Sequence, residues 1–226
     1  MTLVRPTRRA LLRAGLVAGL APALPAWAQD AATDTGTDTG AGTDAEAGTA
    51  ARTVEVMATG AEDAPVTVIE YASLTCPHCA RFQTDVYPRL NQNYIEPGKV
   101  RFIVRDVYFD RLGLWAAMVA RCGGADKYFG IVDRLYQKQG DWSRKETAQE
   151  ALAAMFAIGR QAGLTDDAMQ DCVQDQAWAE ALVAEFQKNM EADQVEGTPT
   201  FFIDGEKQPN MPYDEFAARL DEALGS

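Results

Sequence analysis

The fold is decided by one stretch of the sequence, Val66-Thr67-Val68-Ile69-Glu70-Tyr71-Ala72-Ser73-Leu74-Thr75-Cys76-Pro77-His78-Cys79. Its largely apolar first half predicts a buried strand, and the Cys-x-x-Cys pair that follows predicts the start of a helix. A helix that begins at Cys76 directs free backbone N–H groups and the positive end of its dipole at the first sulfur, which favours thiolate over thiol. Each unit of pKa depression favours the thiolate by about 1.4 kcal/mol and opposes the disulfide, so the pattern indicates an oxidising dithiol.

His78 is the only histidine of the chain, and it lies between the two cysteines. If it is protonated or donates a hydrogen bond, it also favours the Cys76 thiolate. The alternative for Cys76 and Cys79 is a structural zinc pair, which needs two further ligands, and the sequence holds no second histidine. We therefore favour redox chemistry and expect neither a metal nor a cofactor.

The first 28 residues predict a signal peptide. Four arginines precede an apolar stretch, residues 14–24, that is too short to span a bilayer. Ala26-Trp27-Ala28 offers small residues at the two positions that a signal peptidase reads, so we expect cleavage before Gln29. The segment Thr7-Arg8-Arg9-Ala10-Leu11-Leu12-Arg13 resembles a twin-arginine export motif, and an ordinary secretory signal is the alternative. Either signal implies a bacterial protein exported to the periplasm.

The mature chain is predicted to be strongly acidic. The signal holds four of the 21 basic residues and none of the 33 acidic ones, which leaves a formal charge of −16. Such a surface repels nucleic acid and anionic lipid, so we expect neither nucleic-acid binding nor stable membrane insertion of the mature chain. Residues 29–52 are mostly Asp, Thr, Gly and Ala, and they predict a disordered linker.

A folded α/β domain is predicted from residue 53. Val54 and Val56 alternate in a first short strand, and residues 66–71 and 99–107 supply two more. Between the last two, a helix is expected from Cys76 to about residue 92, with a kink at Pro88.

The pattern then becomes helical over residues 111–194. Ser143 and Glu146 suggest a capping box within this region. The candidate helices are Leu112–Cys122, Asp126–Gln139, Glu146–Ala162, Asp166–Val173 and Gln176–Asp193. A strand within residues 195–205 and a closing helix over 213–224 follow. We interpret residues 53–110 and 195–226 as one core and residues 111–194 as a helical insertion.

Two motifs together resemble a known family. The stretch Val68 to Cys79, followed far downstream by Gly197-Thr198-Pro199-Thr200-Phe201-Phe202-Ile203-Asp204-Gly205, is similar to the DsbA-like thiol:disulfide oxidoreductases of the thioredoxin-fold superfamily. The resemblance covers about residue 53 to the C-terminus. It implies a thioredoxin-like α/β fold with an inserted all-helical block.

The resemblance also implies roles for individual residues. Cys76 takes the position of the exposed nucleophile and Cys79 that of the buried resolving cysteine, with Pro77 and His78 completing the motif. Thr198-Pro199 matches a cis peptide beside the disulfide, whose backbone pairs with an extended substrate.

Glu70 interrupts the central strand six residues before Cys76. A carboxylate there matches a buried acid that the family uses for proton transfer near the resolving cysteine, as the resemblance implies. The alternative is a strand-end glutamate that reaches solvent.

Cys122 and Cys172 lie in two different predicted helices and lack redox spacing. We interpret them as a structural disulfide, whose loop of about 50 residues is worth roughly 4 kcal/mol in chain entropy. Two buried free thiols or a second redox pair are the alternatives. Four methionines follow helical spacing and are interpreted as core rather than as a copper or substrate surface, namely Met118, Met155, Met169 and Met190.

The expected function is an enzyme that donates the Cys76–Cys79 disulfide to reduced proteins outside the cytoplasm. The resemblance implies reoxidation by a DsbB-like membrane quinone reductase. Thr198 keeps an isomerase or reductase open as an alternative, since threonine at this position is also found in those relatives. A second alternative is a periplasmic copper-binding protein of the ScsC type, in which Cys76 and Cys79 hold Cu(I).

Overall fold

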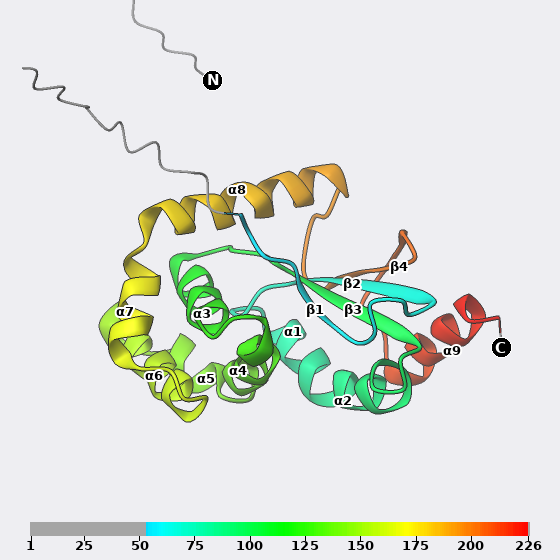
Figure 1. The fold of residues 1–226 in the computed structure, drawn as a ribbon, viewed down its shortest axis with the longest axis horizontal. Helices are drawn as coiled ribbons and strands as arrows, with labels where there is room; N and C mark the ends of the chain where they lie inside the picture. The colour runs from blue at the N-terminus through cyan, green and yellow to red at the C-terminus, as the bar shows by residue number, and fades with distance from the viewer. Residues whose placement is uncertain (1–52, 226) are drawn as a thin grey trace, which may run out of the picture. The chain divides into compact units, whose positions relative to one another are not determined.

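A five-stranded mixed sheet organises the chain. The computed structural model describes residues 53–225, so the predicted signal peptide (1–28) and linker (29–52) lie outside the described residues. The strands are β1 (Met57–Thr59), β2 (Val66–Ala72), β3 (Val100–Asp106), β4 (Thr200–Ile203) and β5 (Glu206–Gln208). Their order is β1-β3-β2-β4-β5, with β2 and β3 parallel and the other pairs antiparallel. Figure 1 labels β1 to β4 of this sheet.

The active-site helix follows β2 and is continuous from Pro77 to Ile95. Its segments are α1 (Pro77–Arg81), the π-helical turn η1 (Phe82–Val86), α2 (Tyr87–Leu90) and a second π-helical turn, η2 (Asn91–Ile95). A single helix with an irregularity at Pro88 was the sequence prediction. The irregularity takes the form of a π turn that ends two residues before Pro88, because a proline ring cannot follow a regular helical turn without a clash.

Helices fill the chain between β3 and β4, as the periodicity predicts. They are α3 (Arg111–Cys122), α4 (Ala125–Gln137), α5 (Gln139–Ser143), α6 (Ala148–Gln161), α7 (Asp166–Gln174) and α8 (Gln176–Ala192). The predicted capping box of Ser143 and Glu146 is wrong. Ser143 ends the short helix α5, and Thr147 with Glu150 forms the capping box of α6 four residues later.

Two details at the edges of the sheet differ from the sequence prediction. The first strand is not centred on Val54 and Val56, since β1 begins at Met57, which pairs with Val104 of β3. Met57 is 2% exposed and Val56 is 62% exposed, so burial selects the methionine. Strand β5 was not predicted, although the turn that leads into it is the sequence Asp204-Gly205, with φ values of 46° and 87°.

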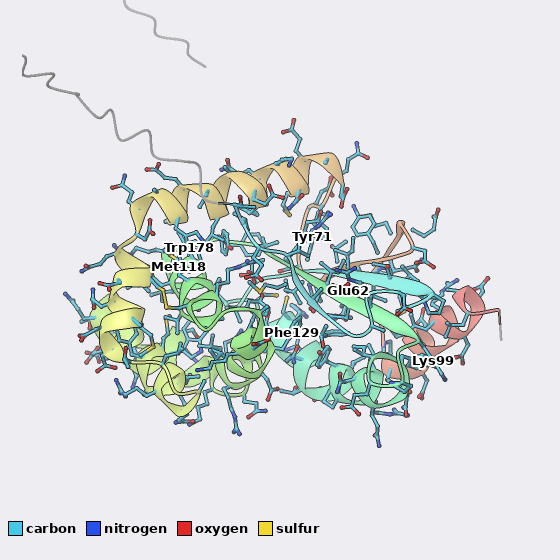
Figure 2. All side chains as sticks on the ribbon, viewed as in Figure 1. Glu62, Tyr71, Lys99, Met118, Phe129 and Trp178 are labelled. Carbon is cyan, nitrogen blue, oxygen red and sulfur yellow. A yellow bond between two sulfur atoms is a disulfide. The ribbon has the colours of Figure 1, made fainter. Side chains whose placement is uncertain are left out.

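The two faces of the sheet are buried against different helices. The active-site face carries Val66, Val68, Glu70 and Ala72 of β2 and packs within the main core, together with α1, α4 and α9 (Tyr213–Ala223). The opposite face, here the α8 face, carries Tyr71, which packs with Phe202 and α8. Figure 1 shows α8 along one side of the sheet and α1, α2 and α9 on the other, and Figure 2 places Tyr71 on the side of α8.

The methionines lie in the core, as interpreted from their spacing. Met118, Met155 and Met169 are at most 1% exposed, and Met190 packs on the α8 face. Among residues 53–225, no helix combines the length and the apolar character needed to cross a membrane.

Candidate active site

The dithiol lies where β2 delivers the chain to α1. Cys76 is the residue that caps the N-terminus of α1, and its backbone is extended, with φ −78° and ψ 121°. Pro77 occupies the first turn of the helix, where its missing N–H removes no hydrogen bond and its fixed φ favours helix initiation. Cys79 follows on the buried side of the first turn. Both cysteines are free thiols in this structure.

Cys76 is the acidic thiol of the pair. Its pKa is lowered from 9.0 to about 5, chiefly by a hydrogen bond from the Cys79 thiol. Burial opposes this shift, since the residue is 9% exposed. The Thr198 side chain and the backbone N–H groups of Cys79 and His78, at the start of α1, lower the pKa further. Cys76 is therefore ionised at neutral pH.

Cys79 has the opposite environment. It is fully buried, and its pKa is raised far above the ordinary value, first by burial, then by its hydrogen bond to Cys76 and by the charge of Glu70. This sulfur holds its proton at neutral pH. For Cys79 to react as a nucleophile, a nearby base must take that proton.

Glu70 lies on the active-site face of β2, 3% exposed. Burial raises its pKa from 4.5 to about 8, and the charges of Asp106 and Cys76 add to the shift. The interpretation of Glu70 as a strand-end residue that reaches solvent is wrong, because β2 continues to Ala72 and the main core encloses the carboxyl group. A carboxyl group with a pKa of about 8 can both give and take a proton near neutral pH.

The His78 ring lies on the exposed side of the helix. Its Nδ1 accepts a hydrogen bond from Arg81 at 2.6 Å. A guanidinium only donates, so this contact requires an unprotonated Nδ1. Within this geometry, His78 stabilises the Cys76 thiolate through its backbone N–H rather than through an imidazolium charge.

Thr198 and Pro199 bring the end of the chain to the dithiol. The peptide bond between them is cis, and the Thr198 carbonyl lies 3.4 Å from Cys76 Sγ, where it accepts a hydrogen bond when Cys76 is protonated. Within the described part of the chain, the buried Thr198 hydroxyl has no hydrogen-bond partner. It nevertheless lies close enough to Cys76 to lower the pKa of that thiol.

A sequence model described as "Thioredoxin" matches residues 52–222. The chain belongs to this thioredoxin family. The thioredoxin-like α/β fold predicted from the two motifs is thereby confirmed.

Several relatives of this thioredoxin-family chain are named for disulfide chemistry. A "Putative protein-disulfide oxidoreductase" of Rickettsia bellii is 32% identical over 169 residues, which are 74% of this chain and 64% of the relative, so the match spans less than two thirds of that protein. "Disulfide bond formation protein D" of Bacillus subtilis is 26% identical over 173 residues, covering 73% of this chain and 75% of the relative. The crystal structure of Wolbachia pipientis alpha-DsbA1 superposes with a TM-score of 0.71 at 26% identity, covering 78% of this chain and 94% of that one.

Other residues support the dithiol of this thioredoxin-family chain and were not found from the sequence. Gln139, at the start of α5, donates from its Nε2 to the carbonyl oxygens of Leu74 (2.8 Å) and Cys76 (3.0 Å), and so ties the helical block to the turn before α1. Thr75 Oγ1 donates to Asp110 Oδ2 at 2.9 Å. Asp110 had a signal in the sequence, because an aspartate before a helical run is a typical N-cap, and it does cap α3. Gln139 had none.

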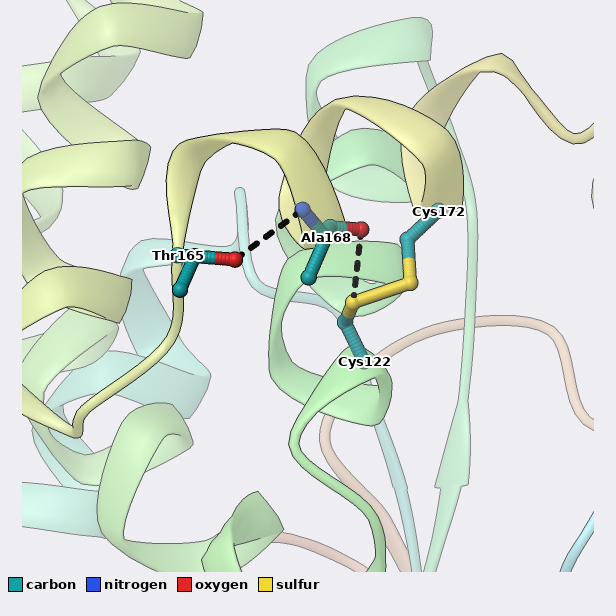
Figure 3. The surroundings of a disulfide bond; sticks show 4 residues. All are labelled: Cys122, Thr165, Ala168 and Cys172. Carbon is teal, nitrogen blue, oxygen red and sulfur yellow. Dashed lines mark hydrogen bonds between the residues drawn. A yellow bond between two sulfur atoms is a disulfide. The ribbon is translucent and has the colours of Figure 1, made fainter.

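Cys122 and Cys172 form a disulfide in this structure, with sulfurs 2.11 Å apart and Cα atoms 6.0 Å apart. Figure 3 shows the bond joining α3 to α7. Cys122 Sγ lies 3.2 Å from the Ala168 carbonyl oxygen, and since a disulfide sulfur carries no proton, this is a close contact rather than a hydrogen bond. Thr165 accepts from the Ala168 N–H and caps α7 beside the bridge.

Across residues 53–225, no group of three or more His, Cys, Asp or Glu side chains is arranged to hold a metal ion.

Proposed function

We propose that this chain is an exported thiol:disulfide oxidoreductase of the DsbA type, which donates a Cys76–Cys79 disulfide to reduced proteins folding in the bacterial periplasm. The observation that carries the proposal is the opposite chemistry of two sulfurs three residues apart. The pKa of Cys76 is lowered to about 5, while that of Cys79 is raised. A stabilised thiolate is a good leaving group, and it makes the reduced enzyme the favoured state. The relatives named as a protein-disulfide oxidoreductase and a disulfide bond formation protein support the same proposed function.

The reaction begins when a substrate thiolate attacks Cys76 Sγ of the oxidised enzyme. A substrate–Cys76 disulfide forms and the Cys76–Cys79 bond breaks. Cys79 leaves with the electron pair and takes a proton from Glu70, which is protonated at neutral pH because its pKa is about 8. We assign Glu70 this role as proton donor and, in the reverse direction, as base.

A second substrate thiolate then attacks the substrate sulfur and releases Cys76 as a thiolate. Two substrate thiols have lost two electrons, which reduce the enzyme disulfide to the dithiol, and Glu70 regains from solvent the proton that it gave to Cys79. One proton ends on Cys79 and the other goes to water, because Cys76 stays ionised. A DsbB-like membrane quinone reductase would return the dithiol to the disulfide.

The remaining site residues would position these reactants. Pro77 and His78 set the start of α1, and Thr198 with Pro199 borders Cys76, where an extended substrate would pair with the backbone. The Cys122–Cys172 bridge would be structural. Export would depend on the predicted signal in residues 1–28.

The proposal is tested by mixing the oxidised protein with a reduced, unfolded substrate such as ribonuclease. We expect rapid transfer of one disulfide per enzyme molecule, measured by trapping free thiols at successive times, and the loss of transfer in Cys76→Ser. Cys122→Ala/Cys172→Ala serves as the control that removes two cysteines but retains the dithiol. Slow oxidation combined with efficient rearrangement of scrambled ribonuclease would instead identify an isomerase, and tight Cu(I) binding without transfer a copper protein.

A further inference from the structure

A second buried carboxylate, that of Asp106, lies on the neighbouring strand β3, two residues beyond the partner of Glu70. In the parallel pair of β2 and β3, Glu70 is opposite Val104 and Ala72 is opposite Asp106. Side chains two residues apart on a strand point to the same face, so the carboxylates of Glu70 and Asp106 both lie on the active-site face. Asp106 is 8% exposed.

Asp106 is held as a charged group by a network from two helices. Arg121 Nε of α3 donates to its Oδ2 at 2.7 Å, and the Tyr128 hydroxyl of α4 donates to its Oδ1 at 2.7 Å. Arg121 also donates to the Glu55 carbonyl at 2.9 Å. Because both Asp106 oxygens are bonded to donors, the negative charge of Asp106 is fixed on the sheet face that carries Glu70.

A fixed negative charge inside the core favours the protonated form of a neighbouring carboxyl group. Asp106 is the largest electrostatic cause of the raised pKa of Glu70 after burial itself. The groups that interact electrostatically with Glu70 are Cys76 and Cys79 at the start of α1, Tyr87 in α2, Asp106 in β3 and Tyr136 in α4. Arg121 of α3 is the ion-pair partner of Asp106, and β4 places the apolar Phe201 opposite Glu70.

We propose that Asp106, held by Arg121, is a positioning residue that sets the proton affinity of Glu70 and therefore the pH at which Cys79 can exchange its proton. The inference rests on the proposed function of the dithiol. During reoxidation, ionised Glu70 takes the proton of the Cys79 thiol, the Cys79 sulfur attacks Cys76 Sγ of the mixed disulfide, and the partner leaves as a thiolate with the electron pair. Added to the effect of burial, the charge of Asp106 lowers the fraction of Glu70 that is ionised for this step at a given pH.

Asp106→Asn tests the inference with a readout that belongs to Glu70 alone. The carbonyl stretch of its protonated carboxyl group is followed by infrared difference spectroscopy as the pH is raised, and Glu70→Gln assigns the band. In the reduced wild-type protein, we expect the band to disappear with a midpoint near pH 8. In Asp106→Asn, the midpoint should fall by at least about half a pH unit, a threefold change in the dissociation constant, and the pH profile of Cys79 attack on a glutathione mixed disulfide should shift in the same direction.

Two control variants distinguish the effect of the Asp106 charge from a general loss of structure. Tyr128→Phe removes a hydrogen bond from the same network but retains the charges of Asp106 and Arg121, so the protein should lose stability without a shift of the midpoint. Asp193→Asn breaks the ion pair of Asp193 with Arg105 of β3, which lies on the α8 face of the sheet. Because Glu70 lies on the opposite face, its midpoint should not change.

The outcomes decide between the claims. An unchanged midpoint in Asp106→Asn, or an equal shift in Tyr128→Phe, overturns the inference. If Asp106→Asn does not fold because Arg121 is left buried and unpaired, the double variant Asp106→Asn/Arg121→Gln replaces it. The Glu70 midpoint should then fall by less than in the single variant, because the positive charge of Arg121, which favours ionised Glu70, is lost as well. Failure of the wild-type protein to transfer disulfides would reject the proposed function, whereas the infrared midpoint would still report whether Asp106 controls Glu70.

Discussion

The pH dependence of the equilibrium with glutathione follows directly from the ionisation of Cys76. Below pH 5 the reduced enzyme holds protons on both active-site sulfurs, and above pH 5 it holds one fewer, because the pKa of Cys76 is about 5. Raising the pH therefore favours the reduced enzyme and makes its disulfide more oxidising. We expect the constant for reduction by glutathione to be flat below pH 5 and to rise about tenfold per pH unit above it.

The magnitude at pH 7 comes from the same shift. A thiol with a pKa of about 5 instead of 9.0 gains about 100-fold in favour of the reduced form at pH 7. This gain corresponds to about 3 kcal/mol, or about 60 mV for a two-electron couple. Glu70 opposes the rise near pH 8, since the Cys76 thiolate helps to keep it protonated, so the clearest window is pH 5–7.

The assay equilibrates the protein with mixtures of reduced and oxidised glutathione at pH values from 4 to 8. Acid quenching, alkylation and mass spectrometry of peptides then report the dithiol separately from the Cys122–Cys172 bridge. An equilibrium constant that stays flat up to pH 7 would mean that Cys76 is an ordinary thiol, and the oxidase proposal would lose its electrostatic basis.

Three further predictions concern the four cysteines and His78. Cys76→Ser should abolish disulfide transfer, and Cys79→Ser should accumulate a mixed disulfide through Cys76 on non-reducing gels; transfer at the wild-type rate by Cys76→Ser would contradict the assignment. Cys122→Ala/Cys172→Ala should lower the melting temperature by on the order of 10 °C, since closing a loop of 50 residues is worth about 4 kcal/mol, and leave transfer rates near normal; lost turnover at unchanged stability would indicate a functional pair. His78→Ala should leave the thiolate absorbance midpoint of reduced Cys76 well below the ordinary value of about 8.5, because the stabilising N–H belongs to the backbone; a return to that value would show that the ring is essential.

The sequence predicts most of what lies in a regular pattern. The apolar run of β2 and the Cys-x-x-Cys pair define the strand-to-helix junction, and α3, α4, α6, α7 and α8 begin within two residues of their predicted starts. These predictions succeed because hydrophobic periodicity and helix-start signals act over a few residues.

The errors occur where burial or long-range contact decides. Val56 and Met57 are both apolar, and only the packing of the completed sheet shows that Met57 faces inward. The same limit applies to Gln139, a polar residue between two helices whose amide contacts a turn 63 residues earlier along the chain. The role of Asp106, at the end of a strand, could not be predicted from the sequence either, because its partners Arg121 and Tyr128 reach it only through tertiary packing.

The reactivity of the dithiol depends on the different environments of its two sulfurs. Cys76 lies where a helix begins, and a thiolate is stabilised there by N–H groups that no intrahelical carbonyl can satisfy. One turn later, Cys79 lies against the active-site face of the sheet, where burial opposes any charge. A protein that placed both sulfurs at the surface would lose the reluctance of Cys79 to ionise, and one that buried both would lose the leaving-group quality of Cys76. Because Cys79 is buried, its proton requires a buried partner, and Glu70 on β2 lies on the sheet face that encloses this sulfur.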